Sequence, residues 1–193
     1  MRSDTITVGG SRFRHVNGAW IAEDTVIGDR VTVLPGALLG RPPIPTRAQA
    51  RQAHGALKAL EIGDGCMIGA NAIIYRGATI GDDCLIGDGA CIREGVRIGN
   101  SCIVAMGVTI NYNTIIGSKV KIMDNTHLTG NMIIEDNVFI GPLVATANDN
   151  SMGREAALRV PVELRRREGP IIRRWARIGE GACILPGMEI GEN

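Results

Sequence analysis

The chain has 193 residues, enough for one domain with a hydrophobic core. A formal net charge of +1 gives no general attraction to nucleic acid or to an anionic membrane surface, so neither is expected as a partner. No apolar run approaches the length of a membrane span, and the first ten residues lack the apolar core of a signal peptide. The five cysteines form no CxxC pair, which indicates reduced thiols in a cytoplasmic protein.

The N-terminal part of the chain predicts a hairpin followed by a first repeat unit. Residues 1–20 form the hairpin region, because the short apolar runs around Ile6 and Phe13 flank Gly9 and Gly10. Aliphatic residues then recur every six positions at Ile21, Ile27, Val33 and Leu39. A loop excursion over 41–61 follows. Its prolines make a rigid loop, and the Ala-rich TRAQARQA segment favours a short helix.

A six-residue repeat occupies the middle of the chain. Branched aliphatics recur without a break at Ile62, Ile68, Ile74, Ile80, Ile86, Ile92, Ile98, Val104, Ile110, Ile116, Ile122, Leu128, Ile134 and Ile140. A period of six fits neither an α-helix nor a simple strand, but it fits a short strand plus a tight turn. Three such units close a triangular coil of about 18 residues, and coils stack at about 4.8 Å. The sequence therefore predicts one all-β domain over 1–193, a parallel β-helix.

Within each coil we expect the aliphatic to sit at a corner and point inward. The glycine that often follows it is expected to supply backbone freedom at the bend. Cys66, Cys84 and Cys102 are 18 residues apart and should form one buried column of small apolar thiols rather than a metal ladder. A second excursion covers 147–171, after which the repeat restarts at Ile172.

The segments IGDGCMIGANAII, IGDDCLIGDGACI and IGEGACILPGMEIG resemble the repeats of the hexapeptide-repeat acyltransferases. The resemblance implies a left-handed β-helix, an exception to the usual crossover rule. It also implies a homotrimer with active sites between subunits and acyl transfer from a thioester to an amine or hydroxyl. IIEDNVFIGPLVATANDN, followed by a basic loop and RIGEGACILPGMEIGEN, is similar to nucleotide-sugar acetyltransferases. Acetyl-CoA is then the expected co-substrate, and a sugar or nucleotide sugar the acceptor. Such relatives usually continue for another coil beyond the position of Asn193, so we expect the end of the site that holds CoA to be affected.

His127 is the candidate general base, because histidine can accept a proton near neutral pH. The other histidines, His15 and His54, fall in the hairpin and in the first excursion. The phase of the repeat directs His127 away from the core and places it one coil below Ala145. The alternative interpretation is a surface histidine without a role.

Polar residues near His127 are candidates for acceptor binding. Asp124, Asn125 and Asn131 flank it and either orient the imidazole and bind sugar hydroxyls, or simply stabilise tight turns. Asn148 and Asp149 match the TND-type loop of the related acetyltransferases, which implies contact with the acceptor.

The CoA-binding candidates come from the resemblance and from charge. Gly141 and Pro142 mark the turn where a backbone donor could meet the acyl carbonyl. Arg173, Arg174 and Arg177, with Arg165, Arg166 and Arg167, form a basic cluster that either contacts phosphate or is a solvated face.

Two other protein classes share this repeat. A γ-type carbonic anhydrase needs three converging histidine ligands, and only His127 lies in the long run, so no metal site is expected. A non-catalytic scaffold subunit remains the alternative to the enzyme.

Overall fold

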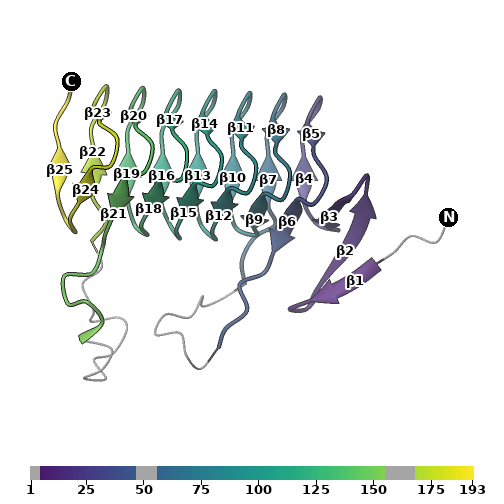
Figure 1. Cartoon of the computed structure of the whole chain (residues 1–193). Helices are drawn as coiled ribbons and strands as arrows, with labels where there is room; N and C mark the ends of the chain where they lie inside the picture. The colour runs from purple at the N-terminus through teal and green to yellow at the C-terminus, as the bar shows by residue number, and fades with distance from the viewer. Residues whose placement is uncertain (1–4, 47–55, 155–167) are drawn as a thin grey trace.

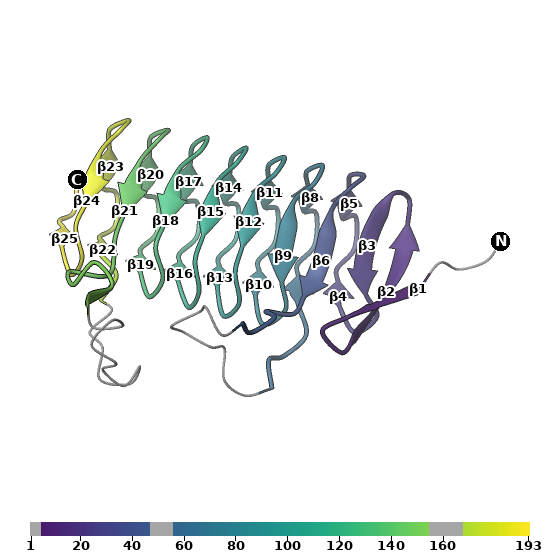
Figure 2. The ribbon, with the colours of Figure 1, turned by 60° about the horizontal axis from the view of Figure 1, so that its bottom comes forward.

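The computed structural model describes residues 5–46, 56–154 and 168–193. Every element bounded in these ranges is a β-strand, and most strands contain two residues. The strands form three parallel sheets, which are the three faces of a stack of triangular coils (Figures 1 and 2). The predicted parallel β-helix is confirmed.

Sheet A has ten strands and includes the N-terminal hairpin. In chain order these are β1 (Thr5–Val8), β2 (Ser11–Val16), β3 (Ala19–Ala22), β6 (Leu38–Arg41), β9 (Ile73–Tyr75), β12 (Cys91–Ile92), β15 (Thr109–Ile110), β18 (His127–Leu128), β21 (Ala145–Thr146) and β24 (Cys183–Ile184). β1, β2 and β3 pair antiparallel, and Gly9 and Gly10 make the first turn, both with positive φ. The hairpin thereby extends sheet A beyond the first coil (Figure 2).

Sheets B and C have eight and seven strands. Sheet B contains β4 (Val26–Ile27), β7 (Glu61–Ile62), β10 (Thr79–Ile80), β13 (Arg97–Ile98), β16 (Ile115–Ile116), β19 (Ile133–Ile134), β22 (Ile171–Ile172) and β25 (Glu189–Ile190). Sheet C contains β5 (Thr32–Val33), β8 (Met67–Ile68), β11 (Leu85–Ile86), β14 (Ile103–Val104), β17 (Lys121–Ile122), β20 (Phe139–Ile140) and β23 (Arg177–Ile178). The chain passes from A to B to C and back to A, so we name the turns the A/B, B/C and C/A corners.

Both excursions leave the coil at the A/B corner. β6 ends at Arg41 and β7 begins at Glu61, whereas β21 ends at Thr146 and β22 begins at Ile171. The two excursions extend from the same edge of the β-helix (Figure 1). The helix predicted for TRAQARQA falls almost entirely on 47–53, outside the described residues, as do His54 and Arg165, Arg166 and Arg167.

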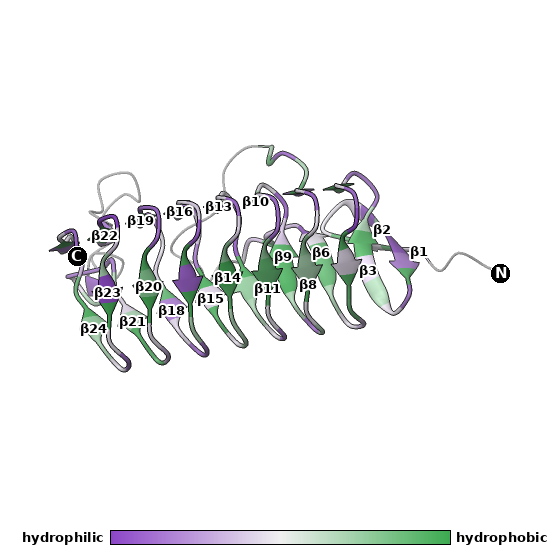
Figure 3. Ribbon diagram, turned by 90° about the horizontal axis from the view of Figure 1, so that it is seen from above, coloured by the Kyte–Doolittle hydropathy of each residue, from purple (hydrophilic) through white to green (hydrophobic). Residues whose placement is uncertain are grey.

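The repeated aliphatics fill the interior, but they do not lie at the corners as the sequence analysis expected. Each is the second residue of a two-residue strand: Ile86 and Ile92, for example, end β11 and β12 and are 0% exposed. Burying one such side chain contributes about 1.5–3 kcal/mol. Figure 3 shows the hydrophobic strands alternating with hydrophilic turns along the stack.

The glycines that follow these aliphatics also have a different role from the one predicted. Gly69 does not have a positive φ, and a Cβ on it would lie 2.5 Å from the backbone nitrogen of Asp88 in the next coil. The left-handed backbone instead occurs two residues further on, at corner residues such as Gly65, Asn71 and Asp83. Glycine after the aliphatic therefore allows close stacking of coils, and the corner residue makes the bend.

The column of Cys66, Cys84 and Cys102 is confirmed, and its thiols do more than fill space. Each sulfur donates to a glycine carbonyl in the next coil, with S···O distances of 3.1 Å to Gly81, Gly99 and Gly117 respectively. Burial raises the pKa of the Cys66 thiol. The three thiols are part of the hydrogen bonding between coils.

Candidate functional site

His127 lies on the outer face of sheet A. It begins β18 and is followed by the fully buried Leu128, so alternation along the strand turns the imidazole outward. It pairs with Thr109 of β15 on one side and with Ala145 of β21 on the other. The predicted orientation and the position one coil below Ala145 are confirmed.

The imidazole of His127 is half-buried and held by one neighbour. Its Nδ1 is 2.7 Å from the hydroxyl oxygen of Thr109. Burial lowers the pKa of His127, since desolvation disfavours the imidazolium. If Nδ1–H donates to the hydroxyl, Nε2 keeps its lone pair and can accept a proton.

Asn148 belongs to a polar cluster at the A/B corner. It is 8% exposed, and its Nδ2 donates to the Gly130 carbonyl at 2.9 Å and to the Tyr112 hydroxyl at 3.3 Å. The Tyr112 ring covers Gly130, where a Cβ would lie 2.5 Å from the ring. Asn131 follows Gly130 and accepts from Asn113 Nδ2 at 3.3 Å. Asn131 and Asn148 therefore meet at one corner.

Asp149 shapes the start of the second excursion. Its carboxylate accepts from the backbone N–H of Ser151 at 2.8 Å and from the Ser151 hydroxyl at 2.5 Å. The Gly153 N–H donates to its other oxygen at 3.2 Å. These contacts form a local turn.

Asp124 and Asn125 lie at the C/A corner, where they stabilise turns. The Asp124 carboxylate accepts from the Met106 N–H at 3.0 Å, as the Asp88 carboxylate does from the Ala70 N–H at 2.7 Å. Asn125 has a φ of 56°, typical of the corner residue of this repeat. Both side chains therefore have roles that belong to the repeat.

Gly141 and Pro142 lie at the same corner, one coil further on. The Gly141 N–H donates to the Ile178 carbonyl at 2.9 Å, and proline carries no N–H. The Gly141 carbonyl accepts from the buried Thr126 hydroxyl at 2.8 Å. The backbone of this pair is thus used in coil stacking, and its contact with CoA stays a prediction.

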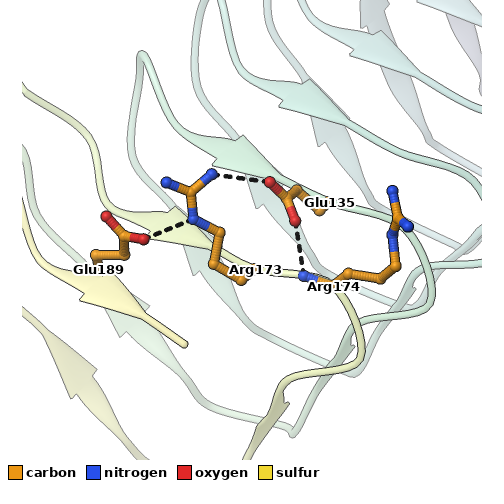
Figure 4. A network of polar contacts seen from close by, with 4 residues as sticks. All are labelled: Glu135, Arg173, Arg174 and Glu189. Atoms are coloured by element: carbon orange, nitrogen blue, oxygen red, sulfur yellow. Dashed lines mark hydrogen bonds and ion pairs between the residues drawn. The ribbon is translucent and has the colours of Figure 1, made fainter. Parts of the chain in front are cut away.

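The three arginines lie at and after the B/C corner. Arg173 is bound to two carboxylates, with 2.9 Å to Glu135 and 2.6 Å to Glu189 (Figure 4). The Arg174 backbone N–H donates to Glu135 at 2.9 Å, while its guanidinium points away from this network. Arg173 lowers the pKa of Glu135 and of Glu189 by hydrogen bonding.

Within one chain, the predicted site residues fall into three separate groups. His127 is on sheet A, Asn131 and Asn148 are at its A/B corner, and Asp124 and Gly141 are at the C/A corner. The arginines lie on the remaining side of the triangle. The fold thus supplies no common centre from one subunit, whereas a neighbouring subunit could bring two sides together.

Sequence reasoning missed Thr109 and Tyr112. Both have a signal at the coil period, because Thr109 is 18 residues before His127 and Tyr112 is 18 before Gly130. Stepping by one coil from a candidate residue would have identified them. Among the described residues, no group of three or more His, Cys, Asp or Glu side chains could hold a metal ion. Nor does any helix in these ranges have the length and apolarity to cross a membrane.

Comparison with known proteins supports the resemblance seen in the repeats. The family model "Bacterial transferase hexapeptide (six repeats)" matches residues 60–94 and 77–112. A search of curated protein sequences gives no significant match. Together with the coils described above, the match identifies the chain as a hexapeptide-repeat protein, and the resemblance to that superfamily is confirmed.

Two solved structures share the fold. A mutant GDP-perosamine N-acetyl transferase from Caulobacter crescentus, in complex with CoA and GDP-perosamine, aligns with a TM-score of 0.51 and 18% identity over 64% of this chain and 50% of that chain. The UDP-N-acetylglucosamine acyltransferase from Campylobacter jejuni aligns with a TM-score of 0.56 and 19% identity over 91% of this chain and 59% of that one. The alignments thus span half to three fifths of those proteins. At this identity they establish the fold, a left-handed parallel β-helix.

Proposed function

We propose that this chain is an acetyltransferase that moves an acetyl group from acetyl-CoA to an amino or hydroxyl group of a sugar or nucleotide sugar. The observation that carries the proposal is His127: an outward, half-buried imidazole held at Nδ1 by Thr109, with a pKa lowered by burial. The names of the two fold relatives support this class, since both are acyltransferases and both names include a nucleotide sugar.

In this mechanism Nδ1–H of His127 donates to the Thr109 hydroxyl, and Nε2 accepts the proton of the acceptor. The acceptor nitrogen or oxygen then forms a bond to the thioester carbonyl carbon, and the carbon–sulfur bond breaks. The departing thiolate takes a proton, so the products are acetylated sugar and free CoA. Thr109 is a positioning residue that selects the tautomer.

We further propose a cytoplasmic homotrimer in which the neighbouring subunit completes the site. This arrangement would bring a second side of the triangle against the outer face of sheet A. Asn131, Asn148 and Asp149 are then the acceptor-side candidates. Sedimentation analysis should give three times the chain mass of 20.5 kDa.

The test is release of CoA thiol from acetyl-CoA in the presence of a panel of amino-sugar nucleotides. His127→Ala should lower kcat by about 10²–10⁴-fold, whereas His15→Ala, at the ring that stacks 4.8 Å from Trp20, should not change it. Full turnover by His127→Ala would overturn the proposal. Absence of turnover and of acetyl-CoA binding in the unmodified chain would favour the scaffold alternative.

A second comparison isolates Thr109. Thr109→Val should lower kcat roughly tenfold, the equivalent of one hydrogen bond of about 1.4 kcal/mol, with little change in KM. Thr109→Ser keeps the hydroxyl and should retain most activity. A change confined to thermal stability, with an unaltered pH profile, would contradict a positioning role.

A further inference from the structure

A hollow of about 390 Å³ lies on sheet C, away from the outer face of sheet A that carries His127. Lys121, Phe139 and Arg177 pair in register on β17, β20 and β23, and their outward side chains form its first row. A second row at the B/C corner contains Lys119, Asn137 and Trp175. The volume is within the range of small-molecule sites, about 300–1,000 Å³.

The charge of this hollow has one sign. Lys119, Lys121 and Arg177 line it, and no acidic residue does. Neither lysine forms an ion pair with any residue that the structure describes. In Figure 3 the hydrophilic β23 lies next to the hydrophobic β20, so cationic and apolar surfaces are adjacent.

Arg177 is fixed in place by the backbone of the corner. Its NH1 donates to the carbonyls of Asn137 at 2.7 Å, Trp175 at 2.8 Å and Ala176 at 3.2 Å. Its Nε and other terminal nitrogen bond to no described residue. Because one nitrogen orients the guanidinium, the others are presented with little loss of side-chain freedom, which favours binding of an anion.

Two residues of the hollow occupy unfavourable backbone positions. Trp175 has a φ of 66° and Lys119 a φ of 59°, at a corner position that glycine, asparagine, aspartate or serine fills in most other coils. A bulky residue in the left-handed region is disfavoured, and such outliers gather at functional sites. Half of the Trp175 surface is exposed (49%), and the Arg177 guanidinium lies 5.8 Å from the ring centroid.

We propose that this hollow binds a nucleoside phosphate, with the base on the Trp175 and Phe139 rings and the phosphates on Lys119, Lys121 and Arg177. Aromatic rings stack bases of any kind, and the three cations match two or more phosphate charges. The inference deepens the proposed function, since CoA and a nucleotide-sugar acceptor both carry such a group. It does not depend on His127, because binding here requires no acyl transfer.

Calorimetry with defined probes tests the site: adenosine 3′,5′-bisphosphate, UDP, GDP and inorganic pyrophosphate. We expect saturable binding of at least one nucleotide, weakening with added salt, and much weaker binding of pyrophosphate. Preference for adenosine 3′,5′-bisphosphate would assign the hollow to the nucleotide of CoA. Preference for UDP or GDP would assign it to the acceptor. No nucleotide binding, or pyrophosphate binding as tight as any nucleotide, would overturn the proposal.

Matched variants separate binding from folding. Trp175→Gly relieves the positive φ and should weaken nucleotide binding roughly 5- to 100-fold, by loss of stacking. Leu143→Gly makes the same relief at a corner with φ of 60° outside the hollow and should leave binding unchanged. Lys119→Asn should weaken binding and reduce its salt dependence, whereas Ser101→Asn, one coil earlier at the same corner, should do neither.

Equal nucleotide affinity in Trp175→Gly and Leu143→Gly would refute the stacking role. Nucleotide binding in a chain with no transferase activity would leave this site standing and remove the proposed function. His127-dependent acetyl transfer without nucleotide binding at Trp175 would do the reverse.

Discussion

Substitution of Gly69 by alanine tests the close stacking of coils. A Cβ on Gly69 would lie 2.5 Å from the nitrogen of Asp88 and 2.6 Å from the carbonyl carbon of Gly87. Ordinary Cβ contacts begin at 3.4 Å, so the next coil must retreat by about 0.9 Å. The atoms in the way are backbone, and the Gly69 N–H is bound to the Ile86 carbonyl at 2.7 Å. Rotamer changes cannot relieve this clash.

The expected loss in the free energy of unfolding is about 2–3 kcal/mol, at the upper end of typical overpacking costs because hydrogen bonds between coils must also lengthen. Gly179→Ala is the matched control. It occupies the same place after a buried aliphatic, and a Cβ there would have nothing within 4 Å. It should be neutral, or stabilise by up to about 1 kcal/mol by restricting the unfolded chain.

Urea unfolding followed by circular dichroism measures both variants. With a slope of about 2–3 kcal/mol per molar, Gly69→Ala should lower the midpoint by roughly 1 M without a change in slope. Coincident transitions by tryptophan fluorescence would show that the coils unfold together rather than locally. Equal midpoints for Gly69→Ala and Gly179→Ala would refute the argument that glycine is required here by coil spacing.

Three further predictions concern the base, the core and the last coils. Because burial lowers the pKa of His127, the neutral imidazole predominates at pH 7; kcat/KM should be flat above about pH 6.5 and fall as pH drops through the lowered pKa. An acid limb with a midpoint above 7 would contradict this. Ile92→Ala, at a fully buried position, should cost about 2–5 kcal/mol in urea unfolding, whereas Val26→Ala, 58% exposed, should change stability by less than about 0.5 kcal/mol. Similar losses for both would show that the interior is not tightly packed. Arg173 lowers the pKa of Glu135, so this pair stabilises the fold above the ordinary glutamate pKa of about 4.3 and the contribution is lost as pH falls through the lowered value. Glu135→Gln should therefore lower the thermal midpoint at pH 7 but not near pH 3, and a pH-independent difference would exclude the ion pair as its cause.

The sequence by itself determined the architecture, because a period of six admits one way of burying aliphatics at every unit. The run from Ile62 to Ile140 predicted the parallel coils, the outward direction of His127 and the column of Cys66, Cys84 and Cys102. Each of these follows from counting along one chain, since residues 18 apart lie in register on adjacent coils.

Only the tertiary structure decided what each position contacts across the stack. It showed that Gly69 is needed for coil spacing rather than for a bend, that Arg173 is bound to Glu135 and Glu189, and that Thr109 holds the His127 ring. It also placed Lys119, Phe139, Trp175 and Arg177 around one hollow. The physical reason is the second excursion, which separates Phe139 and Arg177 by 38 residues although they are strand neighbours. An insertion of irregular length breaks the count on which the sequence argument depends, and contacts beyond it come from the folded chain alone.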